Sequence, residues 1–206
     1  MVCMVKTSWA KIAIDIVLLP PEEIMEKAIA INRELVKQGS LLELDKEKNL
    51  PHISLAMGRI EEKSLPIAEK ILKELVASHL PIGINVREIT ADPQFPVSQF
   101  QIKKSIQLLN LHEAAMKKFL PLFSYDLSES MFYNGKARKG SVDYASHFSK
   151  MHSFENFQPH LTLGIGANSD YRDPKPFAFT CRTLALSHLG NYNTSAKVLL
   201  RVDKQL

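Results

Sequence analysis

Cysteine is scarce in this chain, and its scarcity excludes several kinds of site. Among 206 residues there are two cysteines, Cys3 and Cys181, and neither belongs to the C-x-x-C pair of zinc and redox motifs. Two isolated cysteines favour free thiols in a reducing compartment, with a disulfide between them as the alternative. The sequence also lacks a glycine-rich phosphate loop and a G-x-S-x-G nucleophile motif. These absences remove the commonest zinc, redox, P-loop and serine-hydrolase motifs from consideration.

Long hydrophobic runs are absent as well. Residues 12–19 form the apolar run nearest the N-terminus, but Asp15 interrupts it and Pro20 and Pro21 end it without a small-residue cleavage site. This run therefore predicts a strand rather than a signal peptide. No other run approaches the roughly 20 residues that cross a bilayer. We predict a cytoplasmic protein that does not enter a membrane.

An excess of one charge is also missing. The chain has 26 Lys and Arg residues against 22 Asp and Glu residues, and no basic block is long enough to be a polybasic arm. The net charge of +4 permits an anionic substrate but does not require nucleic acid. With 45% hydrophobic residues, a chain of 206 residues can bury the core of one domain. No linker divides it, so we predict a single domain over residues 1–206.

The chain does contain an eight-residue motif that occurs twice. Residues 51–58 read PHISLAMG, and residues 159–166 read PHLTLGIG. Four positions are identical, and the other four differ conservatively. Each copy contains the triplet H-x-S/T in a segment that predicts a strand. Two strands in one domain rarely agree at every position unless they share a task.

Strand geometry predicts which side chains of the motif share a face. In an extended strand, alternate side chains point to the same side. His52 and Ser54 should therefore project together, and so should His160 and Thr162. The small residues beyond them should leave this face open for a ligand: Ala56, Gly58, Gly164 and Gly166. The apolar residues between them should enter the core: Ile53, Leu55, Met57, Leu161, Leu163 and Ile165.

The elements expected around the motifs indicate an α+β fold. Strands are predicted near 11–19, 51–58, 82–87, 97–103, 160–166, 177–189 and 196–203. Helices are predicted to begin near residues 20, 64 and 105. Residues 124–158 show no clean period and predict a long loop or lid, with a short helix near 143–150. Because one motif strand repeats, we expect two pseudo-symmetric lobes whose antiparallel or mixed sheets line a central cleft, with helices packed outside.

Two imidazoles that face one cavity suit acid–base chemistry near neutral pH. An unperturbed histidine has a pKa of about 6.5, so one ring can accept a proton while the other donates one. The hydroxyls of Ser54 and Thr162 can hold the non-bridging oxygens of a phosphate between the two rings. Displacement at phosphorus needs little beyond positioning and charge stabilisation. We predict His52 and His160 as the catalytic pair, and Ser54 and Thr162 as phosphate-binding residues.

Other interpretations remain open. A metal site needs three or four ligands, and neither motif contains Asp, Glu or Cys, so we predict no metal and no other cofactor. The same pocket could serve a nucleotide-binding module without catalysis, or the motifs could be structural. A third H-x-S triplet at residues 147–149 lacks the flanking proline and glycine and is interpreted as a chance match. His79 and His112 are predicted on helix surfaces and His188 in a strand, none with a role at the site.

The two motifs resemble the signature of the two-histidine (2H) phosphoesterase superfamily, which is H-x-T/S on two strands of a pseudo-symmetric α+β fold. The resemblance covers about residues 10–203. It implies hydrolysis, without a metal, of a cyclic phosphodiester such as a 2',3'-cyclic nucleotide or RNA end, or cleavage of a 2'-5' linkage. The RNA 2'-5' ligase-like branch usually has a basic residue soon after its second motif, where this chain has residues 163–166, LGIG.

The resemblance implies a nucleotide or an RNA end as the ligand, and the segment 124–158 is predicted to help bind it. Tyr133, Lys136, Arg138 and Tyr144 could line the cleft there, because basic groups meet phosphate and aromatic rings stack on bases. The alternative is a solvated loop whose charges face water. We infer no stable protein partner.

Overall fold

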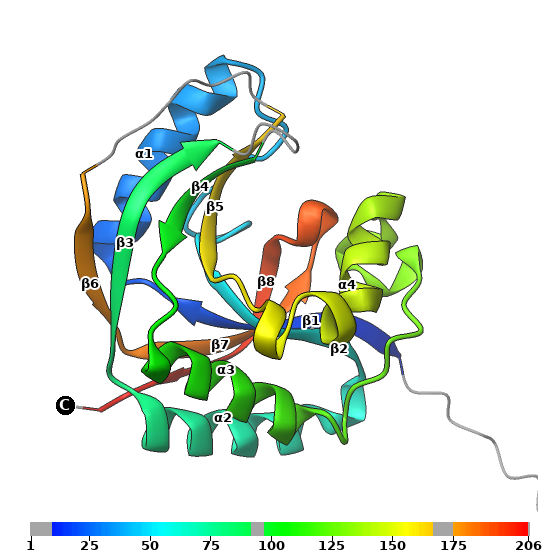
Figure 1. The fold of residues 1–206 in the computed structure, drawn as a ribbon. Helices are drawn as coiled ribbons and strands as arrows, with labels where there is room; N and C mark the ends of the chain where they lie inside the picture. The colour runs from blue at the N-terminus through cyan, green and yellow to red at the C-terminus, as the bar shows by residue number, and fades with distance from the viewer. Residues whose placement is uncertain (1–9, 92–96, 167–174, 206) are drawn as a thin grey trace, which may run out of the picture.

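The chain folds into two four-stranded antiparallel sheets (Figure 1). The structure, a computed structural model, describes residues 10–91, 97–166 and 175–205. Sheet A contains, in spatial order, β2 (Ile53–Glu61), β1 (Lys11–Leu19), β7 (Thr183–Leu189) and β8 (Ser195–Asp203). Sheet B contains β5 (His160–Ile165), β4 (Val97–Ile102), β3 (Ile82–Ala91) and β6 (Phe177–Cys181). The predicted α+β fold with two pseudo-symmetric lobes is confirmed, and both sheets are antiparallel.

The two sheets are arranged alike around the motif strands. In each sheet the motif strand, β2 or β5, lies at one edge, and these two strands contact each other. The motif edges therefore face one another between the lobes. Each motif strand is preceded by a buried proline, Pro51 or Pro159. A proline fits there because the start of an edge strand needs no ladder hydrogen bond from that residue.

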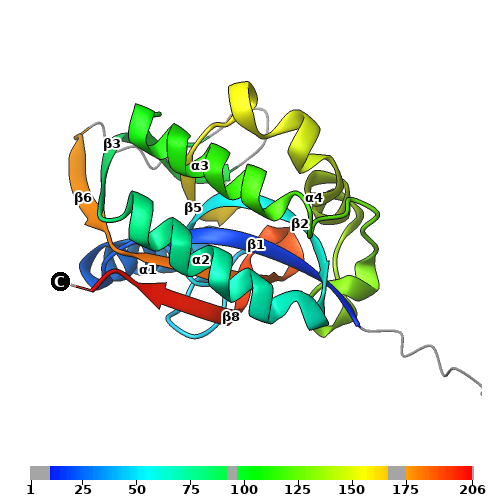
Figure 2. The same ribbon diagram turned by 90° about the horizontal axis from the view of Figure 1, so that it is seen from below.

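Helices pack against both sheets. Helix α1 (Glu22–Lys37) contacts β5 of sheet B, whereas α2 (Leu65–His79) and α3 (Ile106–Phe119) lie side by side along sheet A (Figure 2). Helix α4 (Lys139–Met151) contacts β2. Short 3₁₀ turns complete the fold: η1 (Glu62–Ser64), η2 (Glu129–Met131), η3 (Tyr133–Gly135), η4 (Phe154–Asn156) and η5 (Asn191–Asn193).

Helix α1 illustrates how the sequence directs this packing. Pro21 directly precedes its first residue, and acidic residues occupy its first turn, where they interact favourably with the helix dipole. Gly39 lies just beyond its end with a φ of 94°, a conformation that glycine adopts without strain. Its apolar residues fall at helical spacing and are buried: Ile24, Ala28, Ile31 and Leu35.

The prediction of one strand over residues 177–189 is wrong. The segment forms two strands that belong to different sheets, and the break between β6 and β7 falls at Arg182. Alternate residues of β6 are exposed, as expected at a sheet edge, whereas β7 is almost wholly buried in sheet A. The hydrophobic pattern continues through the break, so no local signal marks the crossing.

The segment 124–158 is more ordered than a loop or lid. It contains α4, which is longer than the short helix predicted near 143–150. Ser141, Ala145 and Phe148 are buried at helical spacing, but two of these three side chains are small and give a weak hydrophobic signal. Phe132 and Phe157, outside the helix, are buried in the core. Buried aromatic residues on both sides of α4 therefore anchor this segment to the hydrophobic core.

The cysteines and the helix lengths bear on the predicted free thiols and the predicted absence of a membrane span. Cys181 is a buried free cysteine, whereas Cys3 lies outside the described residues. Within the ranges that the structure describes, no helix is long and apolar enough to cross a bilayer.

Candidate active site

Each motif strand carries a β-bulge at the same motif position. In β2 the register with β1 shifts directly after Ser54, so the ladder skips Leu55. In β5 the register with β4 shifts directly after Thr162, so the ladder skips Leu163. A bulge places two residues opposite one and re-aims the side chains that follow. The sequence repeat therefore encodes a repeated irregularity in the backbone as well as repeated side chains.

The bulges decide which motif residues line the pocket between the lobes. One cavity, of about 900 Å³, is lined by equivalent residues of both motifs. These are His52, Ser54 and Met57 from the first motif and His160, Thr162 and Ile165 from the second. Strict alternation predicts Met57 and Ile165 in the core. Met57 is buried there and also lines the pocket, whereas Ile165 is only partly buried, so the prediction is wrong for Ile165. The extra residue in each strand reverses the alternation beyond the hydroxyl position.

The small motif residues do not keep the pocket open, contrary to the prediction. A Cβ atom on Gly58 would lie 2.8 Å from the ring of Phe123, and one on Gly164 would lie 2.8 Å from Leu35. These contacts come from α1 and from the chain just beyond α3, not from the pocket. Glycine is needed at both positions because another side chain approaches closely.

Replacing Gly58 by alanine should destabilise the fold. The added methyl group overlaps the Phe123 ring, and overpacking of this kind costs about 1–3 kcal/mol of unfolding free energy. Gly83→Ala is the matched control, because a Cβ atom at Gly83 meets nothing within 4 Å. Urea unfolding of the two variants measures the difference. Equal stability would mean that Phe123 moves aside at no cost.

A buried side chain satisfies the carbonyl of each bulge residue. Nδ1 of His112, in α3, lies 2.7 Å from the Leu55 carbonyl oxygen. Nδ2 of Asn32, in α1, donates to the Leu163 carbonyl oxygen at 2.7 Å. Buried carbonyl groups need such partners, so these two contacts stabilise the bulges. The prediction that His112 lies on a helix surface is wrong, because its side chain is fully buried.

His112 also connects the site to the segment before the second motif. Its Nε2 accepts a hydrogen bond from the Phe154 backbone N–H at 2.7 Å, which fixes the ring as the tautomer protonated at Nδ1. The ring stacks on Phe157, with centroids 3.9 Å apart. Burial lowers the pKa of His112, consistent with a neutral ring. One side chain thus links the first bulge to the approach to the second motif.

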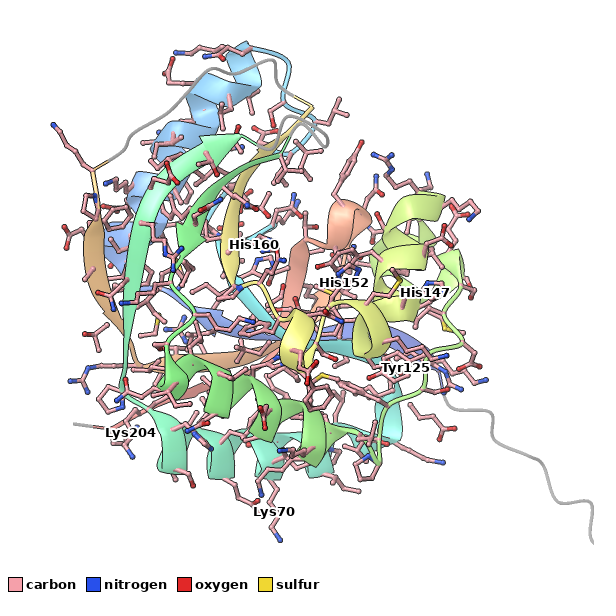
Figure 3. The ribbon with its side chains drawn as sticks, viewed as in Figure 1. Lys70, Tyr125, His147, His152, His160 and Lys204 are labelled. Atoms are coloured by element: carbon pink, nitrogen blue, oxygen red, sulfur yellow. The ribbon has the colours of Figure 1, made fainter. Side chains whose placement is uncertain are left out.

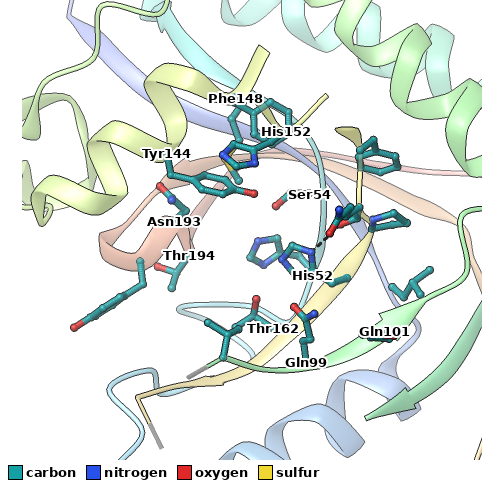
Figure 4. Close-up of a pocket in the computed structure, with 18 of the residues that line it drawn as sticks. His52, Ser54, Gln99, Gln101, Tyr144, Phe148, His152, Thr162, Asn193 and Thr194 are labelled. Carbon is teal, nitrogen blue, oxygen red and sulfur yellow. Dashed lines mark hydrogen bonds between the residues drawn. The ribbon is translucent and has the colours of Figure 1, made fainter. Parts of the chain in front are cut away.

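The motif histidines are held in the same way. Nδ1 of His52 lies 2.7 Å from the Leu50 carbonyl oxygen, and Nδ1 of His160 lies 2.9 Å from the Gln158 carbonyl oxygen. In both cases the carbonyl lies two residues before the histidine. A carbonyl only accepts, so Nδ1 carries the proton in each neutral ring and Nε2 has the free lone pair. Figure 4 shows His52 at the centre of the pocket, with Ser54 and Thr162 on either side.

Burial favours the neutral form of both rings. It is the main cause that lowers the pKa of His52 to about 4, opposed by the Leu50 carbonyl and reinforced by the charge of His160. Burial also lowers the pKa of His160, and the Gln158 carbonyl opposes this shift. The two rings therefore interact electrostatically, and a second proton on the pair is disfavoured.

Asp15 is a site residue that the sequence pattern did not identify. Its side chain is fully buried, and its Oδ2 lies 2.6 Å from Ser54 Oγ and 3.8 Å from His52 Nε2. Burial raises its pKa well above 3.8, while the Ser54 hydroxyl and the Ala56 N–H oppose the shift. A signal was available, because Asp15 is the one charged residue within the apolar run 12–19.

Two aromatic side chains of α4 and its C-terminal end form a wall of the pocket. The rings of Tyr144 and His152 stack with centroids 4.0 Å apart, and both residues line the cavity. Burial raises the pKa of Tyr144 to about 12, with a contribution from the charge of Asp15. Figure 3 shows His152 and His160 on the same side of α4, with His147 farther out on that helix. His152 carries no motif that could have identified it.

The other predicted binding residues lie outside this pocket. Tyr133 and Lys136 line a second, adjoining pocket of about 380 Å³. Arg138 lines neither pocket, and its guanidinium group lies over the Tyr192 ring, 5.0 Å from the centroid. Tyr192 itself lines both pockets. Of the four predicted residues, only Tyr144 reaches the motif histidines' cavity.

Sheet B contributes polar residues that the motifs do not include. Gln99 and Gln101, in β4, line the pocket beside Thr162 and His160. The alternation of polar and apolar residues over 97–103 predicts that they share a face, but not that this face meets the motifs. Among the residues that the structure describes, no group of three or more His, Cys, Asp or Glu side chains is placed to hold a metal ion.

Solved structures resemble this chain over nearly its whole length, although neither a family model nor a curated protein matches its sequence. TT0787 of Thermus thermophilus is 15% identical, with 94% of this chain and 98% of that chain covered and a TM-score of 0.59. Escherichia coli LigT complexed with phosphate is 15% identical, with 96% and 99% covered and a TM-score of 0.53. LigT complexed with 3'-AMP is 14% identical, with 95% and 99% covered and a TM-score of 0.54.

The chain has the LigT fold. LigT and TT0787 are members of the 2H phosphoesterase superfamily, so the predicted resemblance is confirmed at the level of the fold. In this LigT-like fold the two motif edges form opposite walls of the main pocket. Helix α4 and the turn at η5 add further polar and aromatic side chains, among them Asn193 and Thr194 (Figure 4).

Proposed function

We propose that this protein is a metal-independent phosphoesterase. It hydrolyses a cyclic phosphodiester, a 2',3'-cyclic nucleotide or RNA end, or cleaves a 2'-5' linkage, by acid–base catalysis with His52 and His160. One observation carries the proposal: both rings are fixed at Nδ1 by a backbone carbonyl, and both line the same pocket with an adjacent hydroxyl. Each ring therefore offers a free Nε2 to one ligand.

Hydrolysis needs one neutral and one charged ring. The neutral histidine takes a proton from water as the water oxygen attacks phosphorus. The bond from phosphorus to one ribose oxygen breaks, and the charged histidine gives its proton to that oxygen. The product is a nucleoside monophosphate, and the pair has the same number of protons as before. The reverse reaction exchanges the two roles.

A bound anion favours one shared proton on the two histidines. Burial lowers both histidine pKa values, and the charge of His160 lowers that of His52 further. A bound phosphodiester carries a negative charge that raises both values again. The anion thus draws in the single proton that the reaction needs. Ser54 and Thr162, one beside each histidine, are placed to donate to its non-bridging oxygens.

Ligands of similar structures support this substrate class. LigT structures are known with phosphate and with 3'-AMP. A cavity of about 900 Å³ is large enough for a nucleotide, within the usual range of ligand pockets. Tyr144 and His152 offer aromatic faces for a base. Tyr133 and Lys136 line the adjoining pocket, which could take the rest of a longer ligand. Arg138 lies over Tyr192, a residue shared by both pockets.

Turnover of 2',3'-cyclic nucleotides in the presence of EDTA tests the proposal. We expect release of a 2'- or 3'-monophosphate at a rate that EDTA does not change. Activity that EDTA removes and a divalent metal restores would contradict the metal-independent mechanism. Calorimetric binding of a nucleoside monophosphate without turnover of cyclic or 2'-5'-linked substrates would favour the alternative, a nucleotide-binding module.

The pH dependence of the reaction should differ between kcat/KM and kcat. The profile of kcat/KM reports the free enzyme, in which burial lowers both histidine pKa values, that of His52 to about 4. Its maximum should therefore lie below pH 6.5, about the unperturbed value. The profile of kcat reports the complex, whose anion raises both values, so its maximum should lie at higher pH. Coincident profiles would contradict the proposed charge coupling.

A further inference from the structure

Asp15 lies behind Ser54 in surroundings that do not favour its charged form. The carboxyl group is fully buried, and its Oδ1 has no hydrogen-bond partner among the described residues. Its Oδ2 contacts Ser54 Oγ at 2.6 Å. Its nearest potential ion-pair partner is His52, whose Nε2 is 3.8 Å away and whose ring burial keeps neutral. A buried carboxylate with so few hydrogen bonds and no fixed cation is costly.

The fold does not require an acid at this position. Asp15 pairs with Met57 in sheet A, and the equivalent pair in sheet B is Val97 with Ile165. The second lobe therefore builds the same bulge and the same hydroxyl position with a valine. Thr162 has no acid at the equivalent position, whereas Ser54 does. This difference between otherwise matched halves points to a role in the site rather than in folding.

The proton on Asp15 determines the direction of the bond to Ser54. If Asp15 is ionised, it can only accept, so the Ser54 hydrogen points away from the pocket. Ser54 then presents lone pairs to the ligand, and a negative charge lies close behind. If Asp15 is neutral, it donates to Ser54 Oγ and leaves the Ser54 hydrogen free to donate into the pocket. Only the second arrangement suits an anion.

We propose that Asp15 is a positioning residue which, as the neutral acid, donates its proton to Ser54 and turns the Ser54 hydroxyl toward the bound phosphoryl group. This inference rests on the proposed function, because it concerns the same anion site. It predicts that anion affinity depends on three titrating groups, the two motif histidines and Asp15. Burial, which raises the pKa of Asp15, acts in the direction that the role requires.

Several charged or titratable groups surround Asp15 and must be separated from it. His52 faces it from the start of β2, and Tyr144 faces it from α4. His160, in β5, acts on His52, and it also acts on His152 at the end of α4. The histidines lose protons as pH rises and weaken anion binding in every variant. The Asp15 effect is the additional weakening that depends on its carboxyl group.

The first measurement is the titration of Asp15 itself. Carboxyl ¹³C NMR of the wild-type chain, with the signal assigned through its bonds to the backbone, gives the pKa without any ligand. We expect a titration midpoint well above the usual value of 3.8. A midpoint at or below that value would overturn the inference.

The second measurement is sulfate binding as a function of pH, by calorimetry. Sulfate keeps its charge across the neutral range, so the pH dependence reports on the protein. In the wild type, ionisation of Asp15 should weaken binding by about tenfold to hundredfold, the equivalent of one hydrogen bond to a charged group. Asp15→Asn keeps a donor for Ser54 but cannot ionise, so this weakening should disappear.

Two further variants separate positioning from general effects. Ser54→Ala should bind sulfate weakly at every pH, and adding Asp15→Asn to it should change nothing more. Thr162→Val, in the lobe without an acid, should weaken binding but keep the Asp15-dependent step. If Asp15→Asn fails to fold, the wild-type titration and the Ser54→Ala profile still decide. If sulfate affinity depends on pH in Asp15→Asn as it does in the wild type, the inference is overturned.

The outcomes distinguish this inference from the proposed function. Sulfate binding with the Asp15-dependent step, but without turnover of any phosphodiester, would contradict hydrolysis and support the role of Asp15. Turnover of a phosphodiester without the Asp15-dependent weakening of sulfate binding would overturn the role of Asp15 but would still support hydrolysis. A chain that binds no sulfate at any pH would contradict both.

Discussion

Replacing either motif histidine by alanine should lower the turnover of a 2',3'-cyclic nucleotide by about 10²- to 10⁴-fold. Each ring is expected to move one proton per cycle, and alanine can move none. The double variant His52→Ala/His160→Ala should be little worse than either single variant, because groups that act as a unit lose their effect together. Initial rates with saturating substrate, compared across the three variants, give the result.

His147→Ala is the matched control. His147 also begins an H-x-S triplet, but it is exposed on α4, contacts the Asp143 carbonyl and does not line the pocket. This variant should retain wild-type turnover. Full activity in His52→Ala or in His160→Ala would sink the two-histidine mechanism, whatever the behaviour of the control.

Asn32→Leu should strongly destabilise the fold. Asn32 is fully buried in α1 and makes three hydrogen bonds, donating to the carbonyls of Leu42 and Leu163 and accepting from the Leu44 N–H. Leucine has a similar volume but leaves all three backbone groups unpaired. We expect a loss of about 3 kcal/mol of unfolding free energy, measured by urea denaturation.

The same variant should also impair the site. Leu42 and Leu44 line the pocket, and Leu163 is the bulge residue next to Thr162, so Asn32 supports two parts of the wall. Asn85→Leu provides the control, because Asn85 is exposed in β3 and the chemical change is identical. Its stability should stay within about 0.5 kcal/mol of the wild type. If both variants behave alike, the Asn32 hydrogen bonds do not hold the bulge.

The sequence repeat predicted much of this architecture. Two copies of one strand motif implied two related lobes, and the polar triplets placed an imidazole and a hydroxyl of each copy in one cavity. The placement of these side chains depended only on the histidine and hydroxyl positions, which precede each bulge and still follow strand alternation. Beyond Ser54 and Thr162, alternation did not predict that Met57 and Ile165 line the pocket, because periodicity cannot report an extra residue in a ladder.

Other features depended on contacts between distant segments. No Gly, Pro, Asn or Asp marks the point at Arg182 where the chain passes from sheet B to sheet A. The hydrogen-bond partners of His112 lie in β2 and η4, far from α3 in sequence. Asp15 was visible as a charge within an apolar run. Its proposed role depends on its contact with Ser54, which is 39 residues away in the sequence. Tertiary pairing, not local preference, decides these positions.

The strand order also has a consequence for how the molecule is completed during synthesis. Sheet B uses the continuous stretch 82–181, whereas sheet A joins strands from residues 11–61 to strands from 183–203. A growing chain can therefore close sheet B while β1 still exposes an unpaired edge that awaits β7. The lobe that holds His52 is begun first on the ribosome and finished last. Until then, the sheet that carries one wall of the pocket lacks β7 and β8.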